Sequence, residues 1–488
     1  MDSGAELLAC SRAKRSTEDK VVLVFSSPPP RKTTLISPWY SMTIISSAVN
    51  TCSSPSKLRI TDMFFTDIVG APMHCTLMKI TTNQGLVGLG EVRDAGSRTY
   101  AAMLKSRIIG ENPCNIDKIF RRIKQFGGQA RQAGGVCGIE VALWDLAGKA
   151  YGVPVYQLLG GKFRDRIRIY CDTDVRGKHN GSDMGRALKE RMDMGFTFLK
   201  MDLGINQLFG EAGTISSPAG IVSPDLRNLP DRSDPHYRFL ARNRHYDANN
   251  IAHPFTGIHL TEKGFDRLEQ YVHDVRQVIG DEIPLAIDHF GHIGVDDCIK
   301  LCRRIEKYNL AWAEDMLPWQ LTGQYQHLHN HTTVPLCTGE DIYLKENFQP
   351  LLASGALAVI HPDILSSGGI YENKKIGDMA QDYGVAMAIH MAESPVAAMA
   401  AVHSAAATEN FLVCENHSVD VDWWDAITIG TPAKIVQNGY IEVPDKPGLG
   451  IDDFNDEVLK EHLHPAFPTL WAPTNEWDNE WSHDRLWS

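Results

Sequence analysis

The sequence predicts an α/β fold in which a β/α barrel follows a small α+β domain. An acidic residue or a histidine closes each of six short apolar runs between Pro284 and Glu415, at intervals of 26, 26, 23, 27 and 25 residues. Segments of helical length, such as 295–307, lie between the runs. A strand, a helix and two loops need roughly this many residues, so the pattern indicates successive β/α units. The residues that close the runs are Asp288, Glu314, Glu340, Asp363, His390 and Glu415.

Composition narrows the class of protein. The 488 residues allow two domains plus extensions. An apolar fraction of 43% and a charged fraction of 22% are typical of soluble globular proteins. The net charge of −12 argues against nucleic-acid binding, and no run of eighteen apolar residues predicts a membrane span. Ten scattered cysteines without a CxxC pair indicate reduced thiols, so we expect a cytoplasmic protein without a disulfide framework or a zinc site.

Residues 1–56 differ in composition from the rest of the chain. They are rich in Ser and Thr, contain Pro28-Pro29-Pro30, and lack acidic residues between Val21 and Ile60. We expect either an organelle-targeting leader or a disordered extension, since Met42 could itself be a start. Four acids before residue 20 weaken the targeting interpretation.

The α+β domain is expected over residues 57–165. Two strand-like stretches cover 57–69 and 74–92, and the second turns at Asn83-Gln84-Gly85. Helical patterns follow at 115–126 and 138–151.

The barrel is expected over residues 166–425. Its first strands are predicted at 167–174 and 198–204, with a helix near 184–194 between them. An insertion at 205–262, rich in Pro, Asn, Arg and His, follows the second strand, and we interpret it as a lid, a specificity loop or an oligomer contact. The Trp-rich segment 426–488 is expected to pack on the α+β domain or on a neighbouring subunit of a homo-oligomer.

Three of the strand-end acids share one spacing. Asp288, Glu314 and Glu340 follow one another at 26 residues, so they are expected on adjacent strands around one point. Carboxylate oxygens in an open site suit Mg²⁺. A solvated strand end or a salt bridge would explain one such acid, but identical spacing of three favours metal binding.

The next two strand ends supply a carboxylate and an imidazole. Asp363 could fix the tautomer of His390 and raise its basicity, which favours a general base. Lys200, at the end of the second strand, either neutralises a substrate carboxylate or an enolate oxygen, or is a surface lysine. Arg93 and Arg98 either bind the substrate or lie on the surface. Further candidates are Asp172, Asp174, Arg176 and His361.

Over residues 57 to about 460 these motifs resemble the enolase superfamily, mandelate racemase subgroup. The resemblance implies a (β/α)7β barrel under an α+β capping domain, with Mg²⁺ at the barrel mouth and abstraction of the proton α to a carboxylate. It assigns the metal ligands to Asp288, Glu314 and Glu340, and the base to the Asp363–His390 dyad. It also implies that Glu415, protonated, donates a hydrogen bond to the enolic oxygen, which requires a raised pKa.

One motif departs from that pattern. Racemases of the subgroup carry a Lys-x-Lys pair, whereas this chain has Lys200-Met201-Asp202. One-base dehydration of a sugar acid is therefore favoured, with Asp202, Arg93 and Glu415 as candidate contacts to a small carboxylate sugar. Some dehydratases of the family place a histidine two residues after the third-strand aspartate, where this chain has Phe290. The acid for the leaving hydroxyl stays open among five histidines: His253, His259, His289, His292 and His390.

Two alternatives to a dehydratase remain at this stage. One is an epimerase, racemase or cycloisomerase on the same fold. The other is a non-catalytic scaffold, which the retained acid triad and dyad argue against, because a scaffold has no physical need of them.

Overall fold

A computed structural model describes residues 53–173, 178, 180–208, 211–216, 258–289, 291 and 293–480. The predicted extension at 1–56 lies outside the described residues except for its last four. Most of the predicted insertion, 217–257, also lies outside them. Its described base contains η4 (Ile205–Leu208) and an antiparallel pair, β6 (Ile215–Ser216) with β7 (His259–Leu260).

The N-terminal domain is built on a three-stranded antiparallel sheet of β1 (Ile60–Val69), β2 (His74–Thr82) and β3 (Val87–Val92). The predicted turn before β3 is confirmed, with Gly85 at a φ of +79°. Helix α4 (Gly134–Tyr151) packs on the sheet. A Cβ at Gly90 would lie 2.3 Å from the carbonyl oxygen of Gly138, so glycine allows this close approach. The shorter helices are η1 (Pro55–Lys57), α1 (Arg98–Ala102), α2 (Lys105–Ile108), α3 (Ile116–Ile123), η2 (Lys124–Phe126), η3 (Ala130–Ala133) and α5 (Val155–Leu158).

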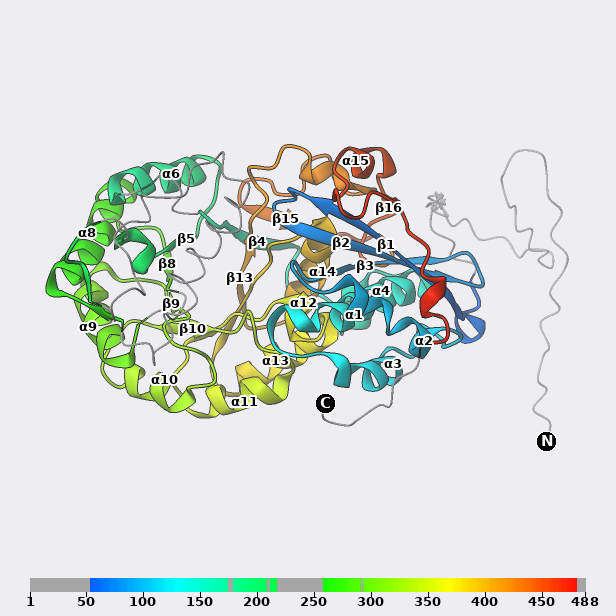
Figure 1. Cartoon of the computed structure of the whole chain (residues 1–488), viewed down its shortest axis with the longest axis horizontal. Helices are drawn as coiled ribbons and strands as arrows, with labels where there is room; N and C mark the ends of the chain where they lie inside the picture. The colour runs from blue at the N-terminus through cyan, green and yellow to red at the C-terminus, as the bar shows by residue number, and fades with distance from the viewer. Residues whose placement is uncertain are drawn as a thin grey trace, which may run out of the picture. The chain divides into compact units, whose positions relative to one another are not determined.

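Eight parallel strands follow, hydrogen-bonded in the order β4-β13-β12-β11-β10-β9-β8-β5. They are β4 (Arg166–Cys171), β5 (Leu199–Asp202), β8 (Leu285–Asp288), β9 (Ala313–Glu314), β10 (Leu336–Thr338), β11 (Val359–Ile360), β12 (Ala386–Ile389) and β13 (Phe411–Asn416). Figure 1 shows the intervening helices on the outside of these strands. They are α6 (Gly181–Asp193), α8 (Glu262–Ile279), α9 (Val295–Ile305), α10 (Thr322–His329), α11 (Lys345–Ala353), α13 (Ile370–Asp382) and α14 (Pro395–Ala407), with the short α12 (Ile364–Ser367) and η5 (Glu306–Tyr308) beside them. This confirms the predicted fold class.

A separate buried cluster fills the inside of the strand ring. It takes one side chain from each strand or from the residue just before it: Tyr170, Phe198, Ala286, Trp312, Cys337, Val359, Ala388 and Val413. The rings of Tyr170 and Phe198 have centroids 5.6 Å apart, so β4 and β5, the first and last of the eight parallel strands, meet through side chains. A packed interior of this kind forms the floor beneath the strand ends.

The segment after the barrel returns to the N-terminal sheet. The backbone N–H of Ala472 donates to the carbonyl of Phe65 (3.0 Å), and that of His464 donates to Asp67 (2.8 Å). Figure 1 shows this red segment alongside the blue strands. The C-terminal segment thus packs on the N-terminal domain of its own chain. Its elements are η6 (Trp424–Ile427), β14 (Thr428–Ile429), β15 (Tyr440–Glu442), β16 (Asp453–Phe454), α15 (Asp456–Glu461) and η7 (Asn475–Trp477).

A buried glutamate joins the N-terminal domain to the barrel. Glu140, in α4, accepts hydrogen bonds from the backbone N–H groups of Ile370 (2.7 Å) and Tyr371 (3.1 Å) and from the indole of Trp144 (2.6 Å). The two backbone groups begin α13, where N–H donors lack partners within the helix and need an acceptor. This contact fixes α13 against α4.

Replacing Gly369 with alanine is expected to weaken that joint. Gly369 has a φ of +94°, and a Cβ there would lie 2.0 Å from Oε2 of Glu140. Gly384→Ala is the control for a positive φ without a clash, because Gly384 has a φ of +71° and no atom within 4 Å of its Cβ position. The control carries only the left-handed backbone cost of about 1–2 kcal/mol. We expect Gly369→Ala to lose about 2 kcal/mol more in urea unfolding; equal losses would contradict the clash.

Glu140 also predicts a pH dependence of stability. Burial raises its pKa to about 8, against the opposing effect of its three hydrogen-bond donors. A folded-state pKa above the ordinary value of 4.5 means that folding takes up a proton. The stabilising contribution is complete below about pH 4.5 and is lost as the pH rises through about 8. Relative to Glu140→Gln, wild-type unfolding free energy should fall by up to about 1 kcal/mol per pH unit in that window. If the unfolding free energies of wild type and Glu140→Gln changed in parallel with pH, the raised pKa of Glu140 would be contradicted.

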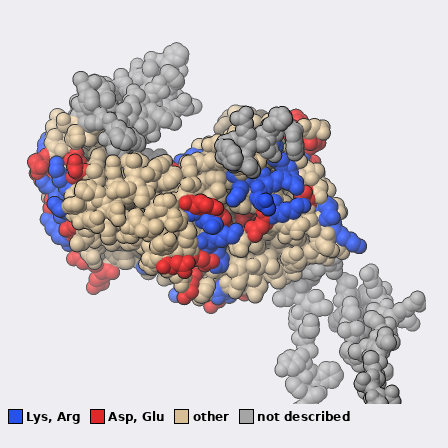
Figure 2. Space-filling model, turned by 90° about the horizontal axis from the view of Figure 1, so that it is seen from below, with Lys and Arg blue, Asp and Glu red and all other residues tan. Residues whose placement is uncertain are grey.

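The described surface carries charges of both signs. Figure 2 shows Lys and Arg next to Asp and Glu on one face, between wide areas that carry neither. Among the helices of the described ranges, none is long and apolar enough to cross a bilayer.

Candidate active site

Buried carboxylates gather at the carboxyl ends of the barrel strands. Asp288 ends β8, Glu314 ends β9 and Glu415 lies near the end of β13. The ammonium of Lys200, on β5, lies 3.3 Å from Oδ2 of Asp288, 3.2 Å from Oε2 of Glu314 and 2.9 Å from Oε1 of Glu415. Burial lowers the pKa of Lys200, but these carboxylates raise it well above its ordinary value. The structure therefore brings two of the three predicted metal ligands to one nitrogen.

The third predicted ligand lies beside the predicted base. Oε2 of Glu340, two residues beyond β10, is 3.0 Å from Nε2 of His390. Nδ1 of His390 is 2.7 Å from Oδ2 of Asp363, so the two form the hydrogen-bonded pair that the spacing predicted. Asp363 is held in turn, because its Oδ1 accepts from the N–H of Leu365 at the start of α12. Oε2 of Glu415 is 3.9 Å from Nε2 of His390, so Glu415 connects the two groups.

The charges around His390 determine its protonation. Burial lowers its pKa, but the carboxylates of Glu340 and Asp363 raise it to about 10. Burial raises the pKa of Glu340, and His390, Arg93 and Lys200 together bring it down to about 2. In this arrangement His390 holds a proton between two carboxylates.

The expected raised pKa of Glu415 is wrong for this arrangement. Burial does raise it, but the Lys200 ammonium and the imidazoles of His417 and His390 lower it well below its ordinary value. The sequence predicts a glutamate at a strand end in a buried site, which by itself would raise the pKa. It does not predict that the Lys200 ammonium lies 2.9 Å away. Here Glu415 is an ionised acceptor; its contact with a substrate stays a prediction.

Arg93 reaches the dyad from the N-terminal domain. It follows β3, is 1% exposed, and its Nη1 lies 2.6 Å from Oδ2 of Asp363 and 2.7 Å from Oε1 of Glu393. These contacts place the guanidinium behind the base. Arg98 instead pairs with Asp67 at 2.6 Å, within the N-terminal domain. Asp202 ends β5 as the register partner of Asp288. The substrate-binding roles predicted for Arg93 and Asp202 stay predictions.

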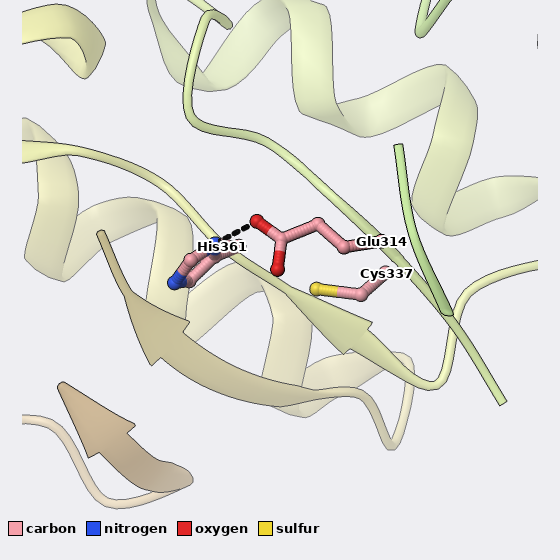
Figure 3. Close-up of side chains that lie close together, drawn as sticks. All are labelled: Glu314, Cys337 and His361. Carbon is pink, nitrogen blue, oxygen red and sulfur yellow. Dashed lines mark hydrogen bonds and ion pairs between the residues drawn. The ribbon is translucent and has the colours of Figure 1, made fainter. Parts of the chain in front are cut away.

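A second group of potential ligands lies deeper in the barrel. Figure 3 shows Glu314, Cys337 and His361 close together, with Nδ1 of His361 2.5 Å from Oε1 of Glu314. Burial and nearby carboxylates raise the pKa of the Cys337 thiol well above its ordinary value, so a metal-ligating thiolate is disfavoured. Nε2 of His361 is 3.0 Å from the hydroxyl of Tyr170. We interpret this group as the support that orients Glu314.

The strand-end carboxylates suit a divalent cation better by donor type. Among the described residues, however, the groups whose ligand atoms all lie within 4.8 Å are Glu314–Cys337–His361 and His390–Glu415–His417, not the predicted Asp288–Glu314–Glu340. Asp288, Glu314, Glu340 and Glu415 are hard oxygen donors at one barrel mouth, and Lys200 is the cation that three of them contact. The ammonium contact of 2.9 Å with Glu415 shows that the site accommodates positive charge. The donor chemistry therefore matches the predicted group.

The histidines considered for the leaving group differ in surroundings. His289 is fully buried and bonded at Nδ1 to the carbonyl of Leu203 (2.8 Å), and burial lowers its pKa to about 4, which disfavours a proton donor. The side chain of His259 is 65% exposed, beside Asp297. The other positions named for this role, His253, Phe290 and His292, lie outside the described residues, as do the candidates Asp174 and Arg176.

Sequence reasoning missed two residues at this site. His417 lies two residues beyond Glu415, with Nδ1 3.4 Å from Oδ2 of Asp172 and Nε2 3.3 Å from Oε1 of Glu415. Its signal was available, because alternate residues of a strand share a face. Glu393, the second partner of Arg93, had no such signal.

An α+β domain joined to a (β/α)7β barrel, with oxygen donors beside a His–Asp pair at the strand ends, defines a barrel enzyme suited to proton abstraction with a divalent cation. The chain belongs to the mandelate racemase subgroup of the enolase superfamily. Residues 48–160 match the mandelate racemase / muconate lactonizing enzyme N-terminal domain, and residues 183–457 match the enolase C-terminal domain-like family.

Individual relatives agree with this membership. A D-xylonate dehydratase of Haloferax volcanii is 31% identical over 77% of this chain and 82% of its own length. A D-galactonate dehydratase of Pectobacterium atrosepticum is 27% identical over 81% of this chain and 92% of its own length. The crystal structure of a mandelate racemase/muconate lactonizing enzyme-like protein from Rubrobacter xylanophilus has a TM-score of 0.68 at 26% identity, covering 84% of this chain and 99% of that one.

Proposed function

We propose that the protein is a Mg²⁺-dependent hydro-lyase that converts an aldonic or aldaric acid to a 2-keto-3-deoxy acid. The observation that carries the proposal is the Asp363–His390 pair beside the carboxylate group, on a chain whose second strand has Asp202 in place of a second lysine. A site with one base for the α-carbon suits elimination better than two-base racemisation. The D-xylonate and D-galactonate dehydratases among the relatives support this substrate class.

The cation is proposed to bind Asp288, Glu314 and Glu340. When bound, Mg²⁺ supplies positive charge that stabilises the second negative charge developing on the substrate carboxylate during proton abstraction.

The chain's own residues supply the remaining steps. Nε2 of His390 takes the α-proton after giving up the proton that it holds against Glu340; a cation bound by Glu340 would neutralise that carboxylate and so lower the pKa of His390. Asp363 accepts the Nδ1–H and holds the tautomer. Lys200 would place its ammonium against the substrate carboxylate, since it already lies 2.9 Å from a carboxylate oxygen of Glu415 at the strand ends. Arg93 orients Asp363 from behind through the 2.6 Å contact. Loss of the β-hydroxyl as water then gives an enol, which ketonises.

The test incubates the purified protein and Mg²⁺ with D-xylonate, D-galactonate and a panel of other aldonic and aldaric acids, and traps keto product with semicarbazide. We expect a semicarbazone from at least one sugar acid. Incorporation of solvent deuterium at the α-carbon without keto product would indicate an epimerase instead. Neither signal, together with unchanged Mg²⁺ affinity in Glu314→Gln, would indicate a non-catalytic scaffold.

Assembly and location remain expectations of the sequence. We expect a homo-oligomer in the cytoplasm, and sedimentation velocity on the purified chain measures the first directly.

A further inference from the structure

A second histidine–aspartate pair lies beside the first. His417 follows the end of β13, and Asp172 follows the end of β4, the strand next to β13. Their side chains approach to 3.4 Å between Nδ1 and Oδ2. Asp363 and His390 lie at the ends of β11 and β12, on the other side of β13. The two pairs therefore flank Glu415 from neighbouring strand ends.

The two imidazoles face the same space. Their ring centroids are 5.7 Å apart, and one nitrogen from each of His390 and His417 lies with a Glu415 oxygen in a group whose members are all within 4.8 Å of one another. That spacing lets two nitrogens reach groups on adjacent carbon atoms of one small molecule. The side chain of His417 is 18% exposed, compared with 5% for that of His390.

The free edge of His417 points inward. Its Nε2 is buried and makes no well-aligned hydrogen bond to another described residue, although Oε1 of Glu415 lies 3.3 Å away. A buried N–H without a good partner is costly, and a ligand oxygen would satisfy it. Asp172, on the opposite nitrogen, orients the ring so that Nε2 faces Glu415.

We propose that His417 is the general acid that protonates the departing β-hydroxyl, in the dehydration proposed above, on which this inference rests. His390 Nε2 takes the proton from the α-carbon, and that electron pair forms the carbon–carbon double bond. The bond between the β-carbon and its oxygen breaks, and the oxygen keeps the pair. Nε2–H of His417 gives that oxygen a proton, so it leaves as water. The enol then gains a proton at the β-carbon from His390 and loses its hydroxyl proton, which restores His417.

The surroundings of His417 suit a donor. Its Nδ1 lies 3.4 Å from a carboxylate oxygen of Asp172, and its Nε2 lies 3.3 Å from Oε1 of Glu415, so acceptors face both ring nitrogens. His289 has the opposite surroundings, since burial lowers its pKa to about 4. His417 combines a carboxylate on Nδ1 with a buried Nε2 that lies beside the base and has no well-aligned hydrogen bond within the described residues.

The test separates proton abstraction from loss of the hydroxyl. Using the aldonate that the wild type dehydrates, His417→Asn is expected to lower kcat for keto-acid formation by about 10²–10⁴-fold. In D₂O with Mg²⁺, the variant should still exchange the α-proton for deuterium, because His390 is intact. The variant should also release fluoride from the 3-deoxy-3-fluoro analogue of that aldonate at close to the wild-type rate, because fluoride departs without a proton. Asp172→Asn should show a smaller loss, and His327→Asn, an exposed histidine on α10, none.

Each outcome assigns a different failure. If His417→Asn dehydrates normally, or loses dehydration, α-exchange and fluoride release together, His417 is not the acid. If the wild type forms no keto acid from any sugar acid of the panel, the proposed function fails, and the role of His417 with it.

Discussion

Replacing His390 with asparagine is expected to abolish both α-proton exchange and dehydration. The imidazole is the basic side chain held by Asp363 at 2.7 Å with its second nitrogen toward the carboxylate group, and asparagine keeps a polar side chain without a basic nitrogen. General-base catalysis typically contributes about 10²–10⁴-fold, so kcat should fall by at least about 10³-fold. Deuterium uptake at the α-carbon in D₂O, followed by NMR, measures the first step without depending on product formation.

Two comparisons make the result specific. His327→Asn, on the exposed face of α10, is expected to leave both rates unchanged. His417→Asn should retain the exchange that His390→Asn loses. If His390→Asn exchanged the α-proton at the wild-type rate, the base would have to be another residue, and the Asp363–His390 pair would have only a structural role.

Regular spacing allowed much of this site to be predicted. In a barrel, each strand end lies at the same edge, so a run of apolar residues that closes with Asp288, Glu314 or His390 predicts convergence without further knowledge. The structure brings Asp288 and Glu314 to one ammonium and joins His390 to Asp363. These residues could be found because their position in the β/α unit determines their position in space.

Contacts between distant units carried no such signal. Arg93 and Asp363 are 270 residues apart, and their pairing depends on how the N-terminal domain packs on the barrel. The pKa of Glu415 depends on Lys200, whose distance from that glutamate the spacing of the strand-end acids does not determine. The spacing of the strand-end residues predicts that they lie at the same end of the barrel. It does not predict which charged side chain of another strand or domain each of them contacts.

The N-terminal domain supports the base as well as covering the barrel. Glu91 of β3 accepts hydrogen bonds from the hydroxyl and backbone N–H of Ser394, which begins α14, directly after the loop that carries His390. Arg93, two residues further along, contacts Asp363 and Glu393. One strand end of the N-terminal domain thus holds both the helix that follows the base and the carboxylate that orients it.

Glu314→Gln is expected to weaken Mg²⁺ binding most among single changes at the barrel mouth. Glu314 is fully buried and receives Lys200 at 3.2 Å, the indole of Trp312 at 3.0 Å and His361 at 2.5 Å, so its carboxylate is held in place before any cation arrives. Loss of residues that merely orient a ligand costs about 10–100-fold in metal affinity, so loss of a ligand should cost at least about 100-fold. Isothermal titration calorimetry with Mg²⁺ measures it, and kcat should fall by about 10³-fold or more because the developing dianion loses its counter-charge.

Glu409→Gln is the matched control for that change. It makes the same substitution at an exposed residue just before β13, and it should alter neither Mg²⁺ affinity nor kcat. In Glu314→Gln the amide keeps the size of the original side chain, so circular dichroism should remain close to that of the wild type, while the unfolding midpoint should fall because Lys200 and His361 lose a buried charge partner. If a folded Glu314→Gln variant bound Mg²⁺ as tightly as the wild type, Glu314 would not be a ligand and the cation would have to bind away from the end of β9. Asp288 and Glu314 both contact Lys200, so this result would also argue against Asp288 as a ligand. Without the cation at these strand ends, nothing would hold the substrate carboxylate there and bring its α-carbon to His390.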